Sequence, residues 1–149
     1  MAIRGFSQLA SMLNERQLIL REVACLSRKE QISGADILSG NNLACICLHF
    51  DAYQTHFVSL GASDEIEISE RLLASGWVPH PISGAAPWKQ IIGSVLVNAW
   101  QLSNSKGYDD CVCLEFQISG AQTVRVLLES AASQLRVFNV TPVHPTSAA

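Results

Sequence analysis

Two short stretches of the sequence share one pattern: DDCVCLEF at residues 109–116 and LACICLHF at residues 43–50. In each stretch every second position is apolar, and the positions between carry a Cys-x-Cys pair followed by a polar or charged residue. A period of two is typical of a β-strand with one face in the core. The apolar positions are Val112, Leu114, Phe116 and Ile118 near the second pair, and Ala44, Ile46, Leu48 and Phe50 near the first. The two stretches therefore predict strands whose cysteines lie on the face away from the core.

The rest of the chain predicts more strands than helices. Further strands are expected at residues 18–26, 53–60, 64–70, 95–100, 122–129 and 133–140, several of them joined by tight turns. A short helix is expected before Gln17, another at residues 69–76, and a third from Pro87, where Trp88, Ile91, Ile92 and Val95 recur at helical spacing. Residues 78–86, which contain prolines and glycine, are expected to form a loop.

These elements predict a single α+β domain. We expect a curved antiparallel sheet of about six strands with one or two helices packed on it. The domain spans residues 1–141, with residues 1–17 as a helical extension and residues 142–149 as a flexible tail. A chain of 149 residues is long enough to bury a core without disulfides or a metal ion.

Composition excludes several classes of protein. The net charge is −3, whereas nucleic-acid binders present a basic face, so we expect no nucleic-acid partner. No apolar run approaches the roughly 20 residues that cross a bilayer, so we expect no membrane partner. The first 17 residues lack the apolar core of a signal peptide, and five cysteines are an odd number. These features favour a cytoplasmic protein with reduced thiols.

The paired cysteines raise the question of a metal site. Residues i and i+2 on a strand are about 6.6 to 6.8 Å apart, whereas zinc holds each thiolate at about 2.3 Å. One strand therefore supplies two ligands poorly, and we expect no metal ion or other cofactor. If the two strands were neighbours, however, Cys47, His49, Cys113 and Glu115 would line a possible ligand site.

No motif in the sequence specifies a reaction. The chain has no GxSxG elbow, no GxGxxG loop, no phosphate-binding loop and no HExxH, and its four histidines are scattered. We therefore assign no catalytic residue, and the sequence favours a protein that is not an enzyme.

Acidic and polar residues suggest a surface for a protein partner. In DEIEISE, residues 64–70, the alternation points Glu65 and Glu67 outward. A second group lies in the turn between two expected strands and consists of Asn104, Tyr108, Asp109 and Asp110. An aromatic side chain at a hairpin is a common interface anchor, and the acids favour a basic partner.

The segments PWKQIIGSVLVNAW and SNSKGYDDCVCLEF resemble a small family of uncharacterised bacterial domains with W, IG, W, N, GY-D and LEF at similar intervals. The resemblance covers residues 43–140, and the matching positions are Trp88, Ile92, Gly93, Trp100, Asn104, Gly107, Tyr108, Asp110 and Phe116. In size, charge and architecture the chain is also similar to immunity proteins of polymorphic toxin systems, which bind and block a toxin.

The preferred hypothesis is a non-enzymatic interaction protein, such as an immunity-like inhibitor that binds a basic toxin through its acidic surface. One alternative is a small-molecule or metal-binding protein, or an enzyme, that uses the polar end of the cysteine-bearing faces. The other alternative is a homodimeric structural module in which a sheet edge or face associates with itself.

Overall fold

The computed structural model describes residues 3–27, 44–60, 65–71, 77–103, 109–131 and 134–140, except for the side chains of Leu60, Asp109 and Ala131. Its elements are α1 (Phe6–Glu15), β1 (Leu18–Ser27), β2 (Cys45–Phe50), β3 (Gln54–Leu60), β4 (Glu65–Ser69), β5 (Val78–Pro81), the 3₁₀ turn η1 (Trp88–Gln90), β6 (Val95–Ser103), β7 (Asp109–Ser119), β8 (Gln122–Ala131) and β9 (Gln134–Val140). The predicted α+β class and antiparallel sheet are confirmed.

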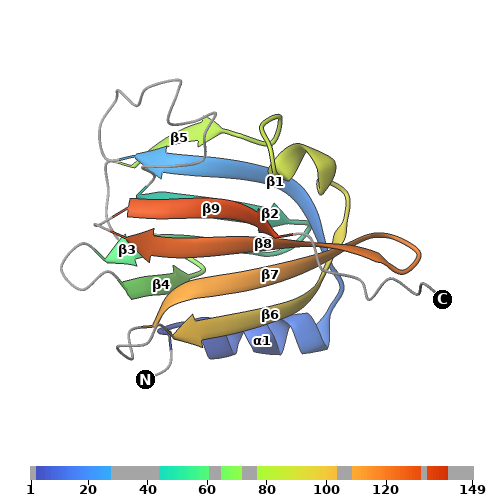
Figure 1. Cartoon of the computed structure of the whole chain (residues 1–149), viewed down its shortest axis with the longest axis horizontal. Helices are drawn as coiled ribbons and strands as arrows, with labels where there is room; N and C mark the ends of the chain where they lie inside the picture. Colours follow the sequence, from blue (N-terminus) through green and yellow to red (C-terminus); the bar gives the residue numbers. More distant parts are fainter. Residues whose placement is uncertain are drawn as a thin grey trace.

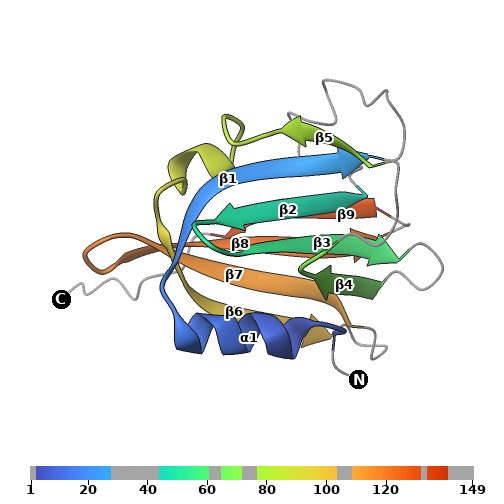
Figure 2. The same ribbon diagram turned by 180° about the vertical axis from the view of Figure 1, so that it is seen from behind.

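The strands run in the order β4-β3-β2-β1-β6-β7-β8-β9, and β5 also pairs with β1. β1 is shared between two parts of this sheet, because its first residues pair with β6 whereas its later residues pair with β5 and β2. We call β4, β3, β2, β1 and β5 the first sheet and β6 to β9 the second sheet. The two lie one in front of the other (Figures 1 and 2), and β3 and β4 contact β8.

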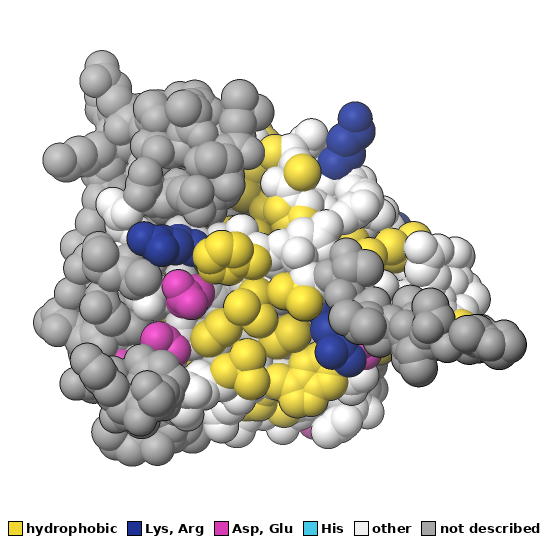
Figure 3. All heavy atoms as spheres, viewed as in Figure 1, with side chains coloured by type: hydrophobic (Ala, Val, Ile, Leu, Met, Phe, Trp, Pro, Cys, Tyr) yellow, Lys and Arg dark blue, Asp and Glu magenta, His cyan; other side chains and the backbone are white. Residues whose placement is uncertain are grey.

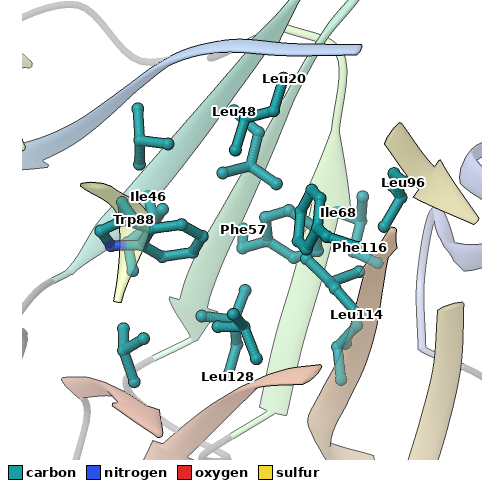
Figure 4. Packing of buried hydrophobic residues seen from close by; sticks show 14 of the residues in the cluster. Leu20, Ile46, Leu48, Phe57, Ile68, Trp88, Leu96, Leu114, Phe116 and Leu128 are labelled. Carbon is teal, nitrogen blue, oxygen red and sulfur yellow. The ribbon is translucent and has the colours of Figure 1, made fainter. Parts of the chain in front are cut away.

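The core fills the space between the two sheets (Figure 4). Ile46 and Leu48 of β2, Phe57 of β3, and Leu114 and Phe116 of β7 all belong to this core, and all five are fully buried. Six of the eight predicted inward positions of the Cys-x-Cys strands are therefore confirmed, whereas Ala44 and Ile118, at the ends, are only half-buried. Burial of these large side chains is the main favourable term in folding.

The N-terminal segment is part of the domain core. α1 packs against β4 and β6 (Figure 2), and its residue Leu9 is fully buried. The Ile68 N–H donates to the carbonyl of Arg4 at 2.8 Å. Gly5 has φ +86°, and a Cβ at this position would overlap the carbonyl of Ile68. The close approach of the segment to β4 therefore requires glycine.

Two sequence predictions are wrong in detail. Nine strands are described, not about six, and one of them is β5, in the stretch predicted to be a loop. Its two prolines lack an N–H, but β5 lies at the edge beside β1, where proline is tolerated.

The helix predicted from Pro87 is only the three-residue turn η1, and Gly93, at φ +86°, precedes the start of β6. The spacing of Trp88 and Ile91 reflects two side chains that enter the core from this turn.

Other predictions fall partly outside the described residues. Ser69, the expected cap of the second helix, is the last residue of β4, and residues 72–76 are not described. The turn at residues 104–108 and the tail at residues 142–149 also lie outside the described part of the chain.

Candidate functional site

The two Cys-x-Cys strands do not meet. β2 belongs to the first sheet and β7 to the second, and β1 and β6 lie between them in the strand order. Because the cysteines face away from the core that the sheets share, Cys47 and Cys113 lie on opposite sides of the molecule. The structure therefore does not bring Cys47 and His49 together with Cys113 and Glu115.

Cys47 and His49 form a local polar contact on the outer face of the first sheet. The Cys47 Sγ atom lies 3.3 Å from His49 Nε2, and Cys47 pairs directly with His56 of β3. Burial raises the pKa of the Cys47 thiol to about 12. A thiol with this pKa is protonated at neutral pH and is a poor nucleophile and metal ligand. Among the described residues, no group of three or more His, Cys, Asp or Glu is arranged to hold a metal ion.

The outer face of the second sheet has a different character. Pairing places its residues in three rows across β6, β7, β8 and β9, which together we call the β6–β9 face. The central row consists of Trp100, Cys113, Leu127 and Phe138. The first border row consists of Asn98, Glu115, Arg125 and Val140, and the second of Leu102, Cys111, Glu129 and Arg136.

Apolar side chains are exposed on this face. Among the described residues, the exposed large hydrophobic side chains are those of Trp100 (38%), Leu102 (42%), Phe138 (41%) and Val140 (38%), and all four belong to the β6–β9 face. Figure 3 shows the apolar side chains gathered there, with charged side chains at the borders. A contiguous apolar patch with a polar border is a common feature of protein-binding surfaces.

A network of polar contacts holds the first border row in place. Glu115 accepts hydrogen bonds from Asn98 Nδ2 at 2.8 Å and Arg125 Nε at 2.9 Å, and more weakly from Thr123 at 3.4 Å. Burial alone would raise the pKa of Glu115, but these bonds outweigh burial and lower it. The Arg125 guanidinium also lies 5.0 Å from the centre of the Trp100 ring, a cation–π contact that orients the ring.

The cysteines of the β6–β9 face contribute apolar surface and no reactive group. Cys111 and Cys113 are only 7% and 8% exposed, although no helix covers them in the described residues. Burial raises the pKa of Cys111 to about 12 and also raises that of Cys113. Both behave as small hydrophobic residues at the centre of the face.

The residues predicted to bind a partner are dispersed. Glu65 and Glu67 lie half-buried on β4, the edge strand of the first sheet, and Glu67 pairs with Arg4 at 3.3 Å. Asp110 lies at the start of β7, close to the second border row, and the backbone of Asp109 precedes it. Asn104 and Tyr108 lie outside the described residues.

Sequence reasoning missed the exposed apolar residues of the β6–β9 face. Neither Trp100 nor Phe138 was predicted to be an exposed ring, yet both are exposed. The sequence of β9 did indicate that Phe138 is exposed, because alternate residues of a strand face opposite sides of the sheet. Leu135 and Val137 are buried, so Phe138 lies on the outer side. An aromatic residue on the outer parity of a strand indicates an exposed ring unless another element covers it.

Comparison with known protein families shows to which family the chain belongs. A family model described as "Family of unknown function (DUF6334)" matches residues 12–144. The chain belongs to this family. The match begins at residue 12, so the family includes most of the N-terminal part that the resemblance over residues 43–140 left out. No curated protein and no solved structure matches the chain. No helix in the described residues has the length and apolar character needed to cross a membrane.

Proposed function

We propose that this member of the DUF6334 family is a non-enzymatic interaction protein that binds a protein partner through the β6–β9 face. The observation that carries the proposal is the gathering of four exposed large hydrophobic side chains on one sheet face. Leaving such side chains in water is unfavourable by roughly 25 cal/mol per Å² of apolar area. A partner that covers them recovers this free energy.

The rigidity of the face supports the same proposal. Its residues belong to paired strands rather than to loops, and Arg125 contacts both Glu115 and the Trp100 ring. Side chains that are already ordered lose little conformational entropy when a partner binds. Aromatic residues such as Trp100 and Phe138 are enriched in protein interfaces, and tryptophan is among the residues that most often dominate binding energies.

The test uses two matched variants on β9. Phe138→Glu places a charge on the face, whereas Asn139→Glu places the same charge on the next residue, which is also exposed but pairs with the core residue Val126. The tagged full-length chain and both variants would be used to capture partners from source cells, followed by binding measurements with each purified partner. We expect Phe138→Glu to weaken binding at least tenfold, and Asn139→Glu to leave it unchanged. Equal binding by all three proteins would refute the proposal.

The acidic residues support a second form of the interaction function, which would use the edge strand β4 and not the β6–β9 face. An immunity-like inhibitor would use acids to attract a basic toxin, and the net charge of −3 together with Glu65 and Glu67 on the edge strand supports this form. Glu65→Lys is the cleaner variant, because Glu67 already pairs with Arg4. It should slow association with a basic partner, and added salt should reduce the difference between variant and wild type.

A small-molecule site or an enzyme active site, the remaining alternative, would have to be lined by side chains on the cysteine-bearing faces. The separation of β2 from β7 and the raised pKa values of Cys47 and Cys111 weigh against it. Alkylation with iodoacetamide at neutral pH checks this alternative. We expect slow alkylation of all four cysteines of the two Cys-x-Cys pairs. A single fast-reacting thiol would instead favour a site at that cysteine.

A further inference from the structure

We propose that the partner of the β6–β9 face is a second copy of this chain, in a reversible dimer with two-fold symmetry. This inference rests on the proposed function and names the occupant of the face.

The face carries no net formal charge, although the chain is acidic. Its two acids, Glu115 and Glu129, are matched by two bases, Arg125 and Arg136, and each acid stands opposite a base on the neighbouring strand. The whole chain has a net charge of −3. Two copies therefore meet with least repulsion through this face, and a neutral face gives a strongly charged partner little to recognise.

The arrangement of apolar residues is also suited to self-association. The central row has an aromatic ring at each end, Trp100 on β6 and Phe138 on β9. Two stacked sheets commonly keep their strand directions within about 30° of each other. In such a stack, a two-fold axis along the strands places Trp100 of one copy near Phe138 of the other. An axis across the strands places each ring near its own equivalent. Aromatic residues meet in both arrangements, and every contact between two different residues occurs twice.

The size of the face indicates a weak dimer. Four strands and three rows cover about 14 Å by 14 Å between Cα atoms. This area is well below the roughly 800 Å² per partner that a standard interface buries, even when the bordering side chains are added. We therefore expect association in the micromolar range, with folded monomers at lower concentration.

Sedimentation equilibrium of the full chain, over about 1 to 500 μM, tests the proposal directly. The wild-type mass should rise towards twice the monomer mass, and Asn139→Glu should behave in the same way. Phe138→Glu and Val140→Glu should each raise the dissociation constant at least tenfold, while thermal unfolding shows that both remain folded. Two variants are used so that misfolding of one leaves the test intact.

Salt provides an independent readout. Self-association through a neutral apolar face should be unchanged or slightly strengthened by added salt, because salt screens the repulsion between two acidic chains. A wild-type protein that stays monomeric throughout, or a dimer that the two face variants do not weaken, would overturn the proposal. If the wild type is monomeric but Phe138→Glu abolishes binding of a different captured protein, the dimer is refuted while the proposed function stands.

Discussion

β2 and β7 carry the same Cys-x-Cys pattern and turn the same face to the core, yet their outer faces differ. Around β2 the outer face is buried, because Cys45 and Cys47 are almost fully buried and so is His56, which pairs with Cys47. Around β7 it is open and apolar, and Cys113 lies between exposed rings of Trp100 and Phe138. The pattern therefore specifies which side chains enter the core. It does not specify what lies over the opposite face, and that is where the candidate function lies.

The largest effects should come from the inward positions, where the two strands are equivalent. Leu48→Ala in β2 and Leu114→Ala in β7 each remove a fully buried side chain from the same core. We expect each to lower the free energy of unfolding by about 2–5 kcal/mol, measured by denaturant titration. A cost below about 1 kcal/mol at either site would show that the strands do not share one core.

The outward cysteines should separate the two strands. Cys45 has no exposed surface, so the hydroxyl of Cys45→Ser would be buried, at a cost of about 1–3 kcal/mol if it finds no partner. Cys113 is 8% exposed, so the hydroxyl of Cys113→Ser can reach water, and we expect a loss below about 1 kcal/mol. Denaturant titration of both variants measures the difference. Equal losses, or a larger loss at Cys113, would contradict the contrast between the two faces.

The response to pH should be smaller and should also differ between the faces. Burial lowers the pKa of His56 from its ordinary value of 6.5, and its Nδ1–H donates to the carbonyl of Ser69 at 3.1 Å. As the pH falls below 6.5, the unfolded chain takes up this proton before the folded chain does. The free energy of unfolding should therefore decrease from that pH downward. His56→Gln should flatten this part of the pH profile.

On the β6–β9 face the corresponding group is Glu115. Its pKa is lowered, so its stabilising contribution is present above the pKa of an unfolded glutamate and is lost as the pH falls through the folded value. Glu115→Gln should therefore change the profile only at acidic pH, below the range that His56 affects. Overlapping effects of the two substitutions would show that the faces do not titrate independently.

Local pattern was sufficient to predict much of the fold. The alternation of Ile66 and Ile68 with Glu65 and Glu67 predicted the buried and outward faces of β4, and the structure confirms them. The hairpin of β8 and β9 was predicted in the same way. These features depend on neighbouring residues, so a single sequence contains them.

The features that were not predicted depend on contacts between distant residues. Leu18 pairs with β6 while Cys25 of the same strand pairs with β5 and β2, and no local period indicates such a shared strand. The β6–β9 face brings Trp100 into line with Phe138 through two intervening strands. Its apolar character becomes visible only when the order and register of the strands are known.

An NMR dilution series shows whether the β6–β9 face is the binding surface. Amide and indole resonances of the ¹⁵N-labelled protein would be followed from high to low concentration. We predict concentration-dependent shifts at the Trp100 indole and along β6 to β9, with β2, β3 and β4 unchanged. Shifts confined to β3 and β4 would contradict a binding surface on the β6–β9 face. So would an absence of shifts at concentrations where sedimentation shows wild type to be dimeric and Phe138→Glu to be monomeric.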